Sequence, residues 1–337
     1  MKLIILFAFT LFTSLLISGQ TGQDNSTKPA VKQDEGQRSS VEAVRLFNAG
    51  KFDEALPFAK EAITAREKTV GKDHLSVAAA WRNLAYIENK LNKPKEAEDA
   101  FDNALSIYEK NQPLSKADEA MFVEMLEAAA YFDIGDGTVS KSASRLTRAI
   151  AIREKINGVD APETARPVIT LGQIYHARGE YGKAAPLLLR GLEIQSKNDV
   201  FSGDESMMLR ETAVCSLIKL DRKEEADDLS KNYRSSTMGA PNTPNDNTIM
   251  GGVVNGKALV LAKPAYPAEA RSKRASGAVA VKVIIDEAGK VIFACGINGS
   301  KLLHLASENA AYRSKFSPTF SGMPVKVSGV ITYNFVP

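Results

Sequence analysis

The chain has 337 residues, of which 44% are hydrophobic and 25% charged, and its formal net charge is +3 at pH 7. This length predicts two or three domains of ordinary soluble composition. The small positive charge comes from scattered lysines without a basic run, which argues against a nucleic-acid-binding protein.

Residues 1–20 have the pattern of an export signal. Lys2 gives a basic start, residues 3–17 are apolar, and Ser18 and Gly19 supply small residues near a cleavage point. The apolar stretch is shorter than the about 20 residues that cross a membrane, but a short uncleaved anchor remains the alternative. The polar residues 21–38 predict a disordered tether.

Residues 39–236 contain an internal repeat. Its aligned segments begin at Gly50, Asn92, Gly137, Gly179 and Asp221, in steps of 42, 45, 42 and 42 residues. A small residue follows at one fixed position in the first four units, at Ala62, Ala104, Ala149 and Gly191. Such a period predicts a solenoid of helix pairs, here about five, in which small residues let helices approach to about 8–10 Å.

Two motifs in this region resemble tetratricopeptide repeats (TPR) of the long form found in kinesin light chain. Residues 171–175 (LGQIY) match the family's "LG..Y" element, and residues 81–85 (WRNLA) are a close variant of "W..LG". The resemblance implies a peptide-binding groove, in which Asn83 stands where the family has an asparagine that binds the ligand backbone. The candidate groove residues, which project from one helix, are Arg82, Asn83, Tyr86, Asn89 and Lys90. A merely solvated helix face is the alternative.

The last part of the chain alternates like a small sheet. Residues 237–251 predict a linker, and residues 252–337 a separate domain. Within it, residues 278–285, 290–297 and 325–335 alternate between apolar and other side chains, which is typical of half-buried strands. With helices expected at about 267–275 and 300–314, the prediction is a small α+β domain with an antiparallel sheet.

The motifs of this domain resemble the C-terminal domain of the TonB family. They are residues 264–271 (PAYPAEAR, including Tyr266 and Pro267), 276–281 (SGAVAV), 286–291 (DEAGKV) and 316–318 (FSP), followed by a valine-rich strand. The resemblance implies that the final strand is an edge to which a short segment of an outer-membrane transporter adds as a new strand. The candidate edge residues are Val327, Gly329, Ile331, Thr332, Tyr333 and Phe335. The alternative is an edge covered by the chain's own residues 253–261 or by a second copy, which would form a homodimer.

Catalytic and metal-binding motifs are lacking in the sequence. His74, His176 and His304 have no partners at metal-ligand spacing, and no phosphate loop or nucleophile motif is present. We therefore expect no enzyme, no cofactor and no metal. Cys215 and Cys295 fall in different predicted domains, and although export favours a disulfide, each lies on an apolar face. We expect two buried free thiols.

These features together predict an adaptor protein of the periplasm or cell envelope. It would bind protein or peptide partners through the TPR groove and by strand addition to the TonB-like domain. The alternative is a TonB-type energy transducer, anchored in the inner membrane and coupled to outer-membrane transport. The lack of a long proline-rich spacer favours the adaptor. A wall- or glycan-binding role for the last domain is a third possibility, and the linker predicts independent motion of the two domains.

Overall fold

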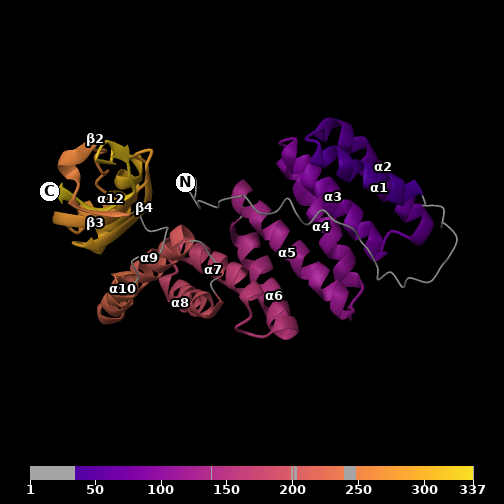
Figure 1. Ribbon diagram of the computed structural model, residues 1–337, viewed down its shortest axis with the longest axis horizontal. Helices are drawn as coiled ribbons and strands as arrows, with labels where there is room; N and C mark the ends of the chain where they lie inside the picture. The colour runs from indigo at the N-terminus through magenta and orange to yellow at the C-terminus, as the bar shows by residue number, and fades with distance from the viewer. Residues whose placement is uncertain (1–34, 138, 199, 201–202, 239–247, 337) are drawn as a thin grey trace. The chain divides into compact units, whose positions relative to one another are not determined.

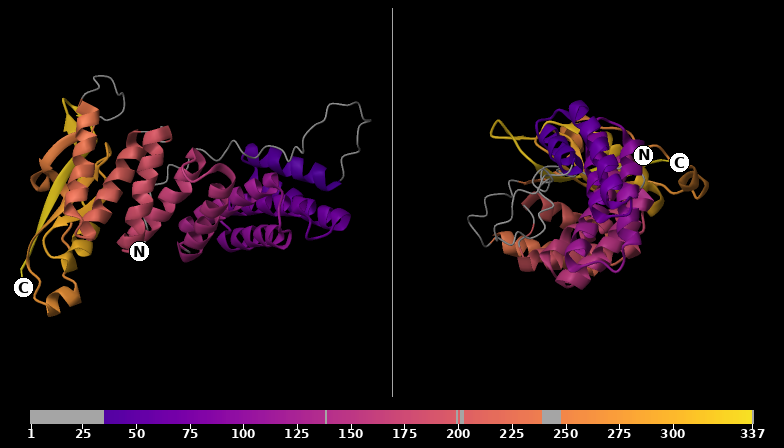
Figure 2. Two further views of the ribbon diagram at one scale, coloured as in Figure 1. Left: turned by 90° about the horizontal axis from the view of Figure 1, so that it is seen from below. Right: turned by 90° about the vertical axis from the view of Figure 1, so that its right-hand side faces the viewer.

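The computed structural model describes residues 35–137, 139–198, 200, 203–238 and 248–336 (Figures 1 and 2). The chain divides into two compact units, Met1–Pro167 and Val168–Pro337. The expected export signal, most of the expected tether, and residues 239–247 of the expected linker lie outside the described residues. None of the described helices is both long and apolar enough to span a membrane.

Paired helices build the first unit and continue into the second. They are α1 (Glu35–Asn48), α2 (Phe52–Val70), α3 (Leu75–Lys90), α4 (Pro94–Lys110), α5 (Lys116–Asp136), α6 (Val139–Asn157), α7 (Pro162–Ala177), α8 (Tyr181–Asn198), α9 (Gly203–Lys219) and α10 (Lys223–Met238). In the first unit each odd-numbered helix packs along the next even-numbered one, and α9 packs likewise on α10. The expected helical-repeat solenoid is confirmed.

Each aligned repeat segment begins with a residue whose backbone is in the left-handed conformation. The five aligned positions all have positive φ: Gly50 at 74°, Asn92 at 58°, Gly137 at 91°, Gly179 at 76° and Asp221 at 63°. Glycine adopts this conformation without strain, and asparagine and aspartate are the side chains that tolerate it best. The repeat is therefore visible in the sequence because each tight turn between paired helices restricts which residues can occupy it.

Small residues bring the paired helices together. Ala62, Ala104 and Ala149 are buried, and a Cβ added to Gly191 on α8 would lie 2.3 Å from Cγ1 of Ile169 on α7. Because real Cβ atoms never come that close to another carbon, α7 and α8 could not keep their present separation with a larger residue at this position.

A buried ion pair lies between α5 and α6. The guanidinium of Arg145 donates two hydrogen bonds of 2.8 Å to the carboxylate of Asp133, which is completely buried, and a third to Asp102. Burial raises the pKa of Asp133 to about 6, although the charge of Arg145 opposes this increase. The pair joins the two helices of the third repeat through their polar groups.

The C-terminal domain is a small mixed sheet with a helix on one face. Its elements are β1 (Ile249–Val253), β2 (Ala258–Val260), α11 (Ala268–Ser272), β3 (Gly277–Ile285), β4 (Val291–Asn298), α12 (Lys301–Arg313), β5 (Lys315–Phe316), β6 (Thr319–Phe320), β7 (Met323–Pro324) and β8 (Val327–Phe335). The main sheet has the order β1-β8-β3-β4, and β2 pairs with β5 in a separate two-stranded ribbon. The expected α+β domain is confirmed, with one parallel pair, β1 and β8.

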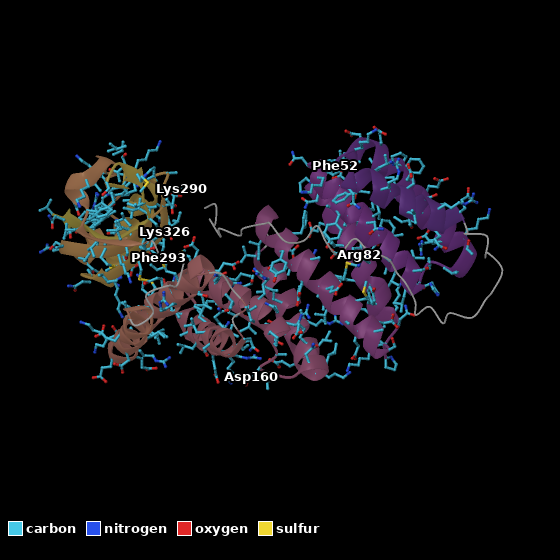
Figure 3. The ribbon with its side chains drawn as sticks, in the orientation of Figure 1. Phe52, Arg82, Asp160, Lys290, Phe293 and Lys326 are labelled. Atoms are coloured by element: carbon cyan, nitrogen blue, oxygen red, sulfur yellow. A yellow bond between two sulfur atoms is a disulfide. The ribbon has the colours of Figure 1, made fainter. Side chains whose placement is uncertain are left out.

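Both faces of the main sheet are covered. Alternate residues of β3, including Val281 and Val283, form a core with Leu303 and Ala310 of α12. On the opposite face, Ile284 packs with Phe293 and Cys295 of β4 and with Met207 and Cys215 of α9 (Figure 3). The last repeat helices therefore belong to the same compact unit as the sheet, which differs from the independent motion expected from the linker.

The final strand is not an open edge, so the sequence-based assignment of its residues is wrong. Strand β8 pairs with β3 along its whole length and with β1 over its first four residues. The predicted edge residues, Val327, Gly329, Ile331, Thr332, Tyr333 and Phe335, lie in the interior of the sheet. Three of them, Ile331, Tyr333 and Phe335, are in its hydrophobic core, and Val327 packs against it. The chain covers this strand itself because Ile249–Val253 supplies the missing neighbour.

Two further contacts close the same strand beyond β1. Asn255 substitutes for a strand residue: its side-chain amide donates to the carbonyl of Thr332 at 2.7 Å and accepts from its N–H at 2.8 Å. Val254 is buried, and a Cβ on Gly329 would lie 2.6 Å from its Cγ1. Gly329 therefore provides space for Val254 and is not a ligand contact.

The two cysteines form a disulfide, which contradicts the prediction of free thiols. Sγ of Cys215 on α9 is bonded to Sγ of Cys295 on β4, across 80 residues of sequence. The apolar surroundings that suggested free thiols are real, since the two residues are only 1% and 2% exposed. They belong to one shared core between helix and sheet, and not to the separate cores of two domains.

Candidate functional site

The predicted groove residues all lie on α3, in the second repeat. Arg82, Asn83, Tyr86 and Asn89 are half-buried, and Lys90 is exposed at the end of the helix. His74 begins this helix, because its Nδ1 accepts the backbone N–H of Ser76 at 3.2 Å. Its role is structural, as a helix cap.

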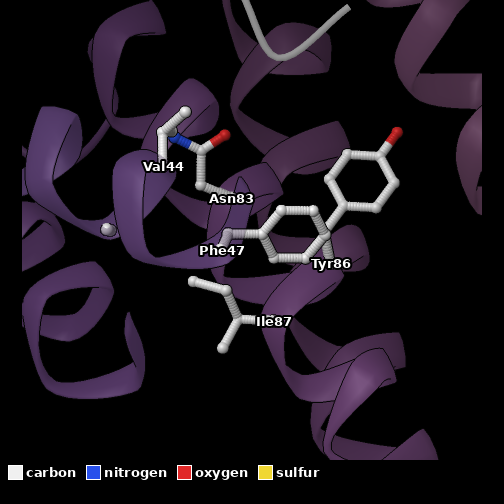
Figure 4. Close-up of a pocket in the computed structure, with 6 residues that line it drawn as sticks. Val44, Phe47, Asn83, Tyr86 and Ile87 are labelled. Carbon is white, nitrogen blue, oxygen red and sulfur yellow. The ribbon is translucent and has the colours of Figure 1, made fainter. Parts of the chain in front are cut away.

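Asn83 and Tyr86 line a narrow notch between α1 and α3. The other lining residues are Ala43, Val44 and Phe47 of α1 and Ile87 of α3. Figure 4 shows Val44 and Phe47 facing the side chains of α3. These side chains leave no room between them for a water molecule. A ligand would therefore lie over the notch, against the two aromatic rings, and not inside it.

Polar atoms beside this notch lack partners. Oδ1 of Asn83 and Nε of Arg82 are buried, and neither has a hydrogen bond within the described part of the chain. A buried polar atom left without a partner costs about 1–3 kcal/mol. A carboxamide next to half-buried aromatic rings is also a group that can pair with the backbone of an extended peptide. Both features favour a peptide-binding role for the notch.

Charged groups continue the site from α3 towards α5 and α6. Burial raises the pKa of Glu124 on α5, and the nearby charges of Arg82 and Arg153 lower it. Next to it, Arg153 donates two hydrogen bonds, of 2.5 and 2.9 Å, to the carboxylate of Glu127. The guanidinium of Arg153 is thus engaged, whereas Arg82 has no ion pair in the described residues.

The structure brings together only part of the predicted set. Asn83 and Tyr86 share the notch, and Arg82 is their charged neighbour, whereas Asn89 and Lys90 do not line it. Sequence reasoning missed Val44 and Phe47 of α1. The repeat alignment contains the signal that could have found them, because one period of 42 residues separates Val44 from Tyr86 and Phe47 from Asn89.

The second predicted site, in the C-terminal domain, has a structural role at the family motif. The hydroxyl of Tyr266 donates to the carbonyl of Ala275 at 2.7 Å, and its ring meets that of Phe335 edge to face. Pro267 precedes the first turn of α11. Tyr266 thus packs the segment before α11 against the last strand of the sheet.

The edge strand β4 is also closed to a partner. The N–H of Ala294 donates to the hydroxyl of Tyr312 at 3.2 Å, and that of Gly296 donates to Oε1 of Glu308 at 2.7 Å. Both acceptors are side chains of α12, so these two backbone N–H groups of the edge strand already have hydrogen-bond partners. Within the described sheet, β1 is the remaining strand with an outer side, and its Met250 and Val253 are 65% and 67% exposed.

Buried polar groups surround the disulfide. Nζ of Lys219 on α9 forms an ion pair of 2.6 Å with Glu308 and lies 2.9 Å from Nδ1 of His304. Ligand atoms of Cys215, Cys295 and Glu308 lie within 4.8 Å of one another. This set does not suit a metal ion, because the two sulfur atoms are bonded to each other and the carboxylate is paired with Lys219.

Comparison with protein families agrees with the two parts of the structure. Residues 43–110 match a family described as tetratricopeptide repeat. Residues 262–337 match the family described as Gram-negative bacterial TonB protein C-terminal. The matched segments cover α2 to α4 with the last six residues of α1, and the C-terminal domain except β1 and β2.

Relatives and solved structures resemble the repeat region. The Arabidopsis thaliana protein kinesin light chain-related 3 is 25% identical over 158 residues, which are 43% of this chain and 23% of that protein. The chain thus spans about a quarter of that relative. A putative kinesin light chain with nearly identical TPR-like repeats from Podosopora anserina is 18% identical, covering 63% of this chain and all of the other, with a TM-score of 0.49. BtubC from P. vanneervenii is 15% identical, covering 64% and 87%, with a TM-score of 0.48.

The common role of these two families is protein–protein interaction. The α1–α3 notch lies in the segment that matches the repeat family. The chain thus resembles a tetratricopeptide-repeat protein over residues 43–110 and a TonB C-terminal domain over residues 262–337.

Proposed function

We propose that the protein is an exported cell-envelope adaptor whose α1–α3 notch binds an extended segment of a partner protein. The observation that carries this proposal is the buried, unpartnered Oδ1 of Asn83 in the notch lined by Phe47 and Tyr86, with the unpartnered Nε of Arg82 near Tyr86. The carboxamide of Asn83 would pair with the partner's backbone, and the two rings would contact an apolar side chain.

Export is supported by two independent features. Residues 1–20 have the pattern of an export signal. The disulfide between Cys215 and Cys295 also fits an oxidising compartment, because such bonds rarely persist where the cell keeps thiols reduced.

The notch is tested by two substitutions on the same helix. We expect Asn83→Ala to reduce capture of a partner from envelope extracts at least tenfold, since it removes a hydrogen bond worth about 1.5 kcal/mol in a desolvated site. Asn89→Ala is the matched control, because Asn89 is on α3 but does not line the notch. Unchanged capture by Asn83→Ala, at unchanged helicity, would remove the proposed role.

A TonB-type energy transducer is the second candidate. The match of residues 262–337 to the TonB C-terminal family supports it. The cross-link from α9 to β4 does so as well, because it would carry tension between helices and sheet. Sequencing the N-terminus of the mature protein separates the two candidates. A chain that begins near Gln20 has lost the segment needed for an inner-membrane anchor, whereas an intact Met1 supports the transducer.

A further inference from the structure

Positive charge is concentrated in the C-terminal domain. Residues 248–336 contain eleven lysines and arginines but four acidic residues, so this segment carries a formal charge of +7, compared with +3 for the whole chain. The rest of the chain is therefore net acidic. Such an asymmetry predicts that the domain attracts carboxylates, from within the chain or from a partner.

On the side of the sheet that faces α9, the lysines are already paired. Lys282 bonds Glu211 at 2.5 Å, and Lys326 bonds Asp204 at 2.6 Å. Lys301, at the start of α12, bonds Asp221 in the turn after α9 at 2.6 Å. The domain thus binds carboxylates of α9 and of the turn after it by lysine–carboxylate pairs around an apolar centre.

A second group of lysines has no such partner. Lys257 and Lys263 flank β2, Lys315 begins β5, and Lys290 forms a backbone bridge with Lys315. All four are exposed, and none has an ion pair among the described residues. The backbone contacts hold them together, since Val260 of β2 pairs with Lys315. We name this surface, with residues 259–261, the basic ribbon.

The same ribbon exposes apolar side chains. Leu259, Val260 and Leu261 are 70%, 53% and 38% exposed. Leu259 is the extra residue of a bulge, at which the register of β2 against β5 shifts, so its backbone is left out of the ladder. Three consecutive exposed apolar residues among unpaired lysines are unusual for a surface that contacts only water.

We propose that the basic ribbon binds an extended acidic segment of a partner protein, with apolar residues between its carboxylates. Acidic residues would pair with the four lysines, and apolar ones would cover Leu259 and Val260. The side of β2 that is not paired with β5 would supply backbone groups for strand addition. Those polar backbone groups favour a peptide over a lipid surface, which cannot form hydrogen bonds with them.

Two acidic residues lie close to the ribbon and limit its charge. Asp286 and Glu287 are in the turn between β3 and β4, and the carboxylate of Asp286 accepts the backbone N–H of Lys290 at 2.8 Å. The binding segment is therefore expected to make its strongest contacts near Lys257, Lys263 and Lys315, on the part of the ribbon away from this turn.

The test measures binding of synthetic peptides to the full chain. The probe is a fluorescein-labelled peptide of about eight residues in which glutamate alternates with valine, and a matched peptide carries lysine instead of glutamate. We expect the acidic peptide to bind and the basic one not to bind. Replacing Lys257, Lys263 and Lys315 together by glutamine should weaken binding about tenfold and flatten its dependence on salt.

A control variant and a second ligand make the result decisive. Lys68→Gln, Lys72→Gln and Lys95→Gln remove the same charge from exposed positions of the first unit and should leave affinity unchanged. Equal loss in both triple variants would overturn the proposal, because attraction would then depend on net charge alone. Binding to phosphatidylglycerol vesicles without binding to the acidic peptide would overturn it as well. Asn83→Ala should not affect this peptide, so failure of the notch and failure of the ribbon remain distinguishable.

Discussion

Reduction of the disulfide should destabilise the second unit selectively. Cys215 and Cys295 join α9 to β4, so reduction leaves the helix held to the sheet only by apolar packing and by the lysine–carboxylate pairs. The first unit, Met1–Pro167, contains neither cysteine. Its free energy of unfolding should not change.

The size of the effect follows from the length of chain that the bond closes. A loop of 80 residues corresponds to about 4–5 kcal/mol from the chain entropy of the unfolded state, and measured disulfides usually give about 2–4 kcal/mol. Because both cysteines are nearly completely buried, a reductant reaches the bond only after α9 separates from the sheet. Reduction of the native protein should therefore be slow.

The assay is urea unfolding of the full chain with and without dithiothreitol, after reduction in the unfolded state. Comparing the same protein in both states isolates the cross-link, since the buried thiols keep their packing. We expect the transition of the second unit to move to lower urea by an amount equal to about 2–4 kcal/mol. The variant with alanine at both cysteines should not respond to the reductant. Identical wild-type curves in both conditions would refute the covalent connection between α9 and β4.

Further measurements test the packing, the electrostatics and the processing of the chain. Asp133 has a pKa of about 6 in the folded protein, above its ordinary 3.8, so its contribution to stability is present below pH 3.8 and is lost as pH rises through 6. In urea unfolding, the wild type should therefore lose up to about 3 kcal/mol of stability relative to Asp133→Asn between pH 4 and 7. A difference between the two proteins that does not change with pH would contradict this. Gly191→Val should destabilise the second unit by about 1–3 kcal/mol in the same assay, because the new side chain meets Ile169. Lys219→Met should cost up to about 3 kcal/mol, because the half-buried Glu308 carboxylate loses its ion pair while it keeps the hydrogen bond from the N–H of Gly296. Adding Glu308→Gln should restore most of this; no recovery would argue against a direct pair. Mass spectrometry of the mature protein should find a chain lacking about 20 N-terminal residues, and an intact start would contradict cleavage.

The repeat architecture could be predicted because its turns restrict sequence. Gly50, Asn92 and Asp221 stand at equivalent positions for one reason, the positive φ that each turn requires. The three long strands of the C-terminal domain were also visible, since buried and less buried residues alternate over residues 278–283 of β3 and 329–335 of β8. Local patterns of this kind depend on near neighbours in the chain.

Features that depend on distant partners were not predictable in the same way. The disulfide joins residues 80 positions apart, and each cysteine alone resembles an ordinary core residue. Strand β1 is five residues long and includes Gly251 and Gly252, so its pattern is too short to reveal that it covers β8. The candidate notch was found only on its α3 side, because Phe47 contributes from a different helix.

The central claim, recognition of a partner by the α1–α3 notch, is tested most directly by photo-crosslinking in living cells. Benzoylphenylalanine is placed at Phe47, which lines the notch, or at Phe58 on α2, which is also half-buried but does not line it. The account predicts a discrete protein adduct from position 47 that disappears in the Asn83→Ala background, and no such adduct from position 58. No adduct at position 47, or the same adducts from both positions, would contradict it.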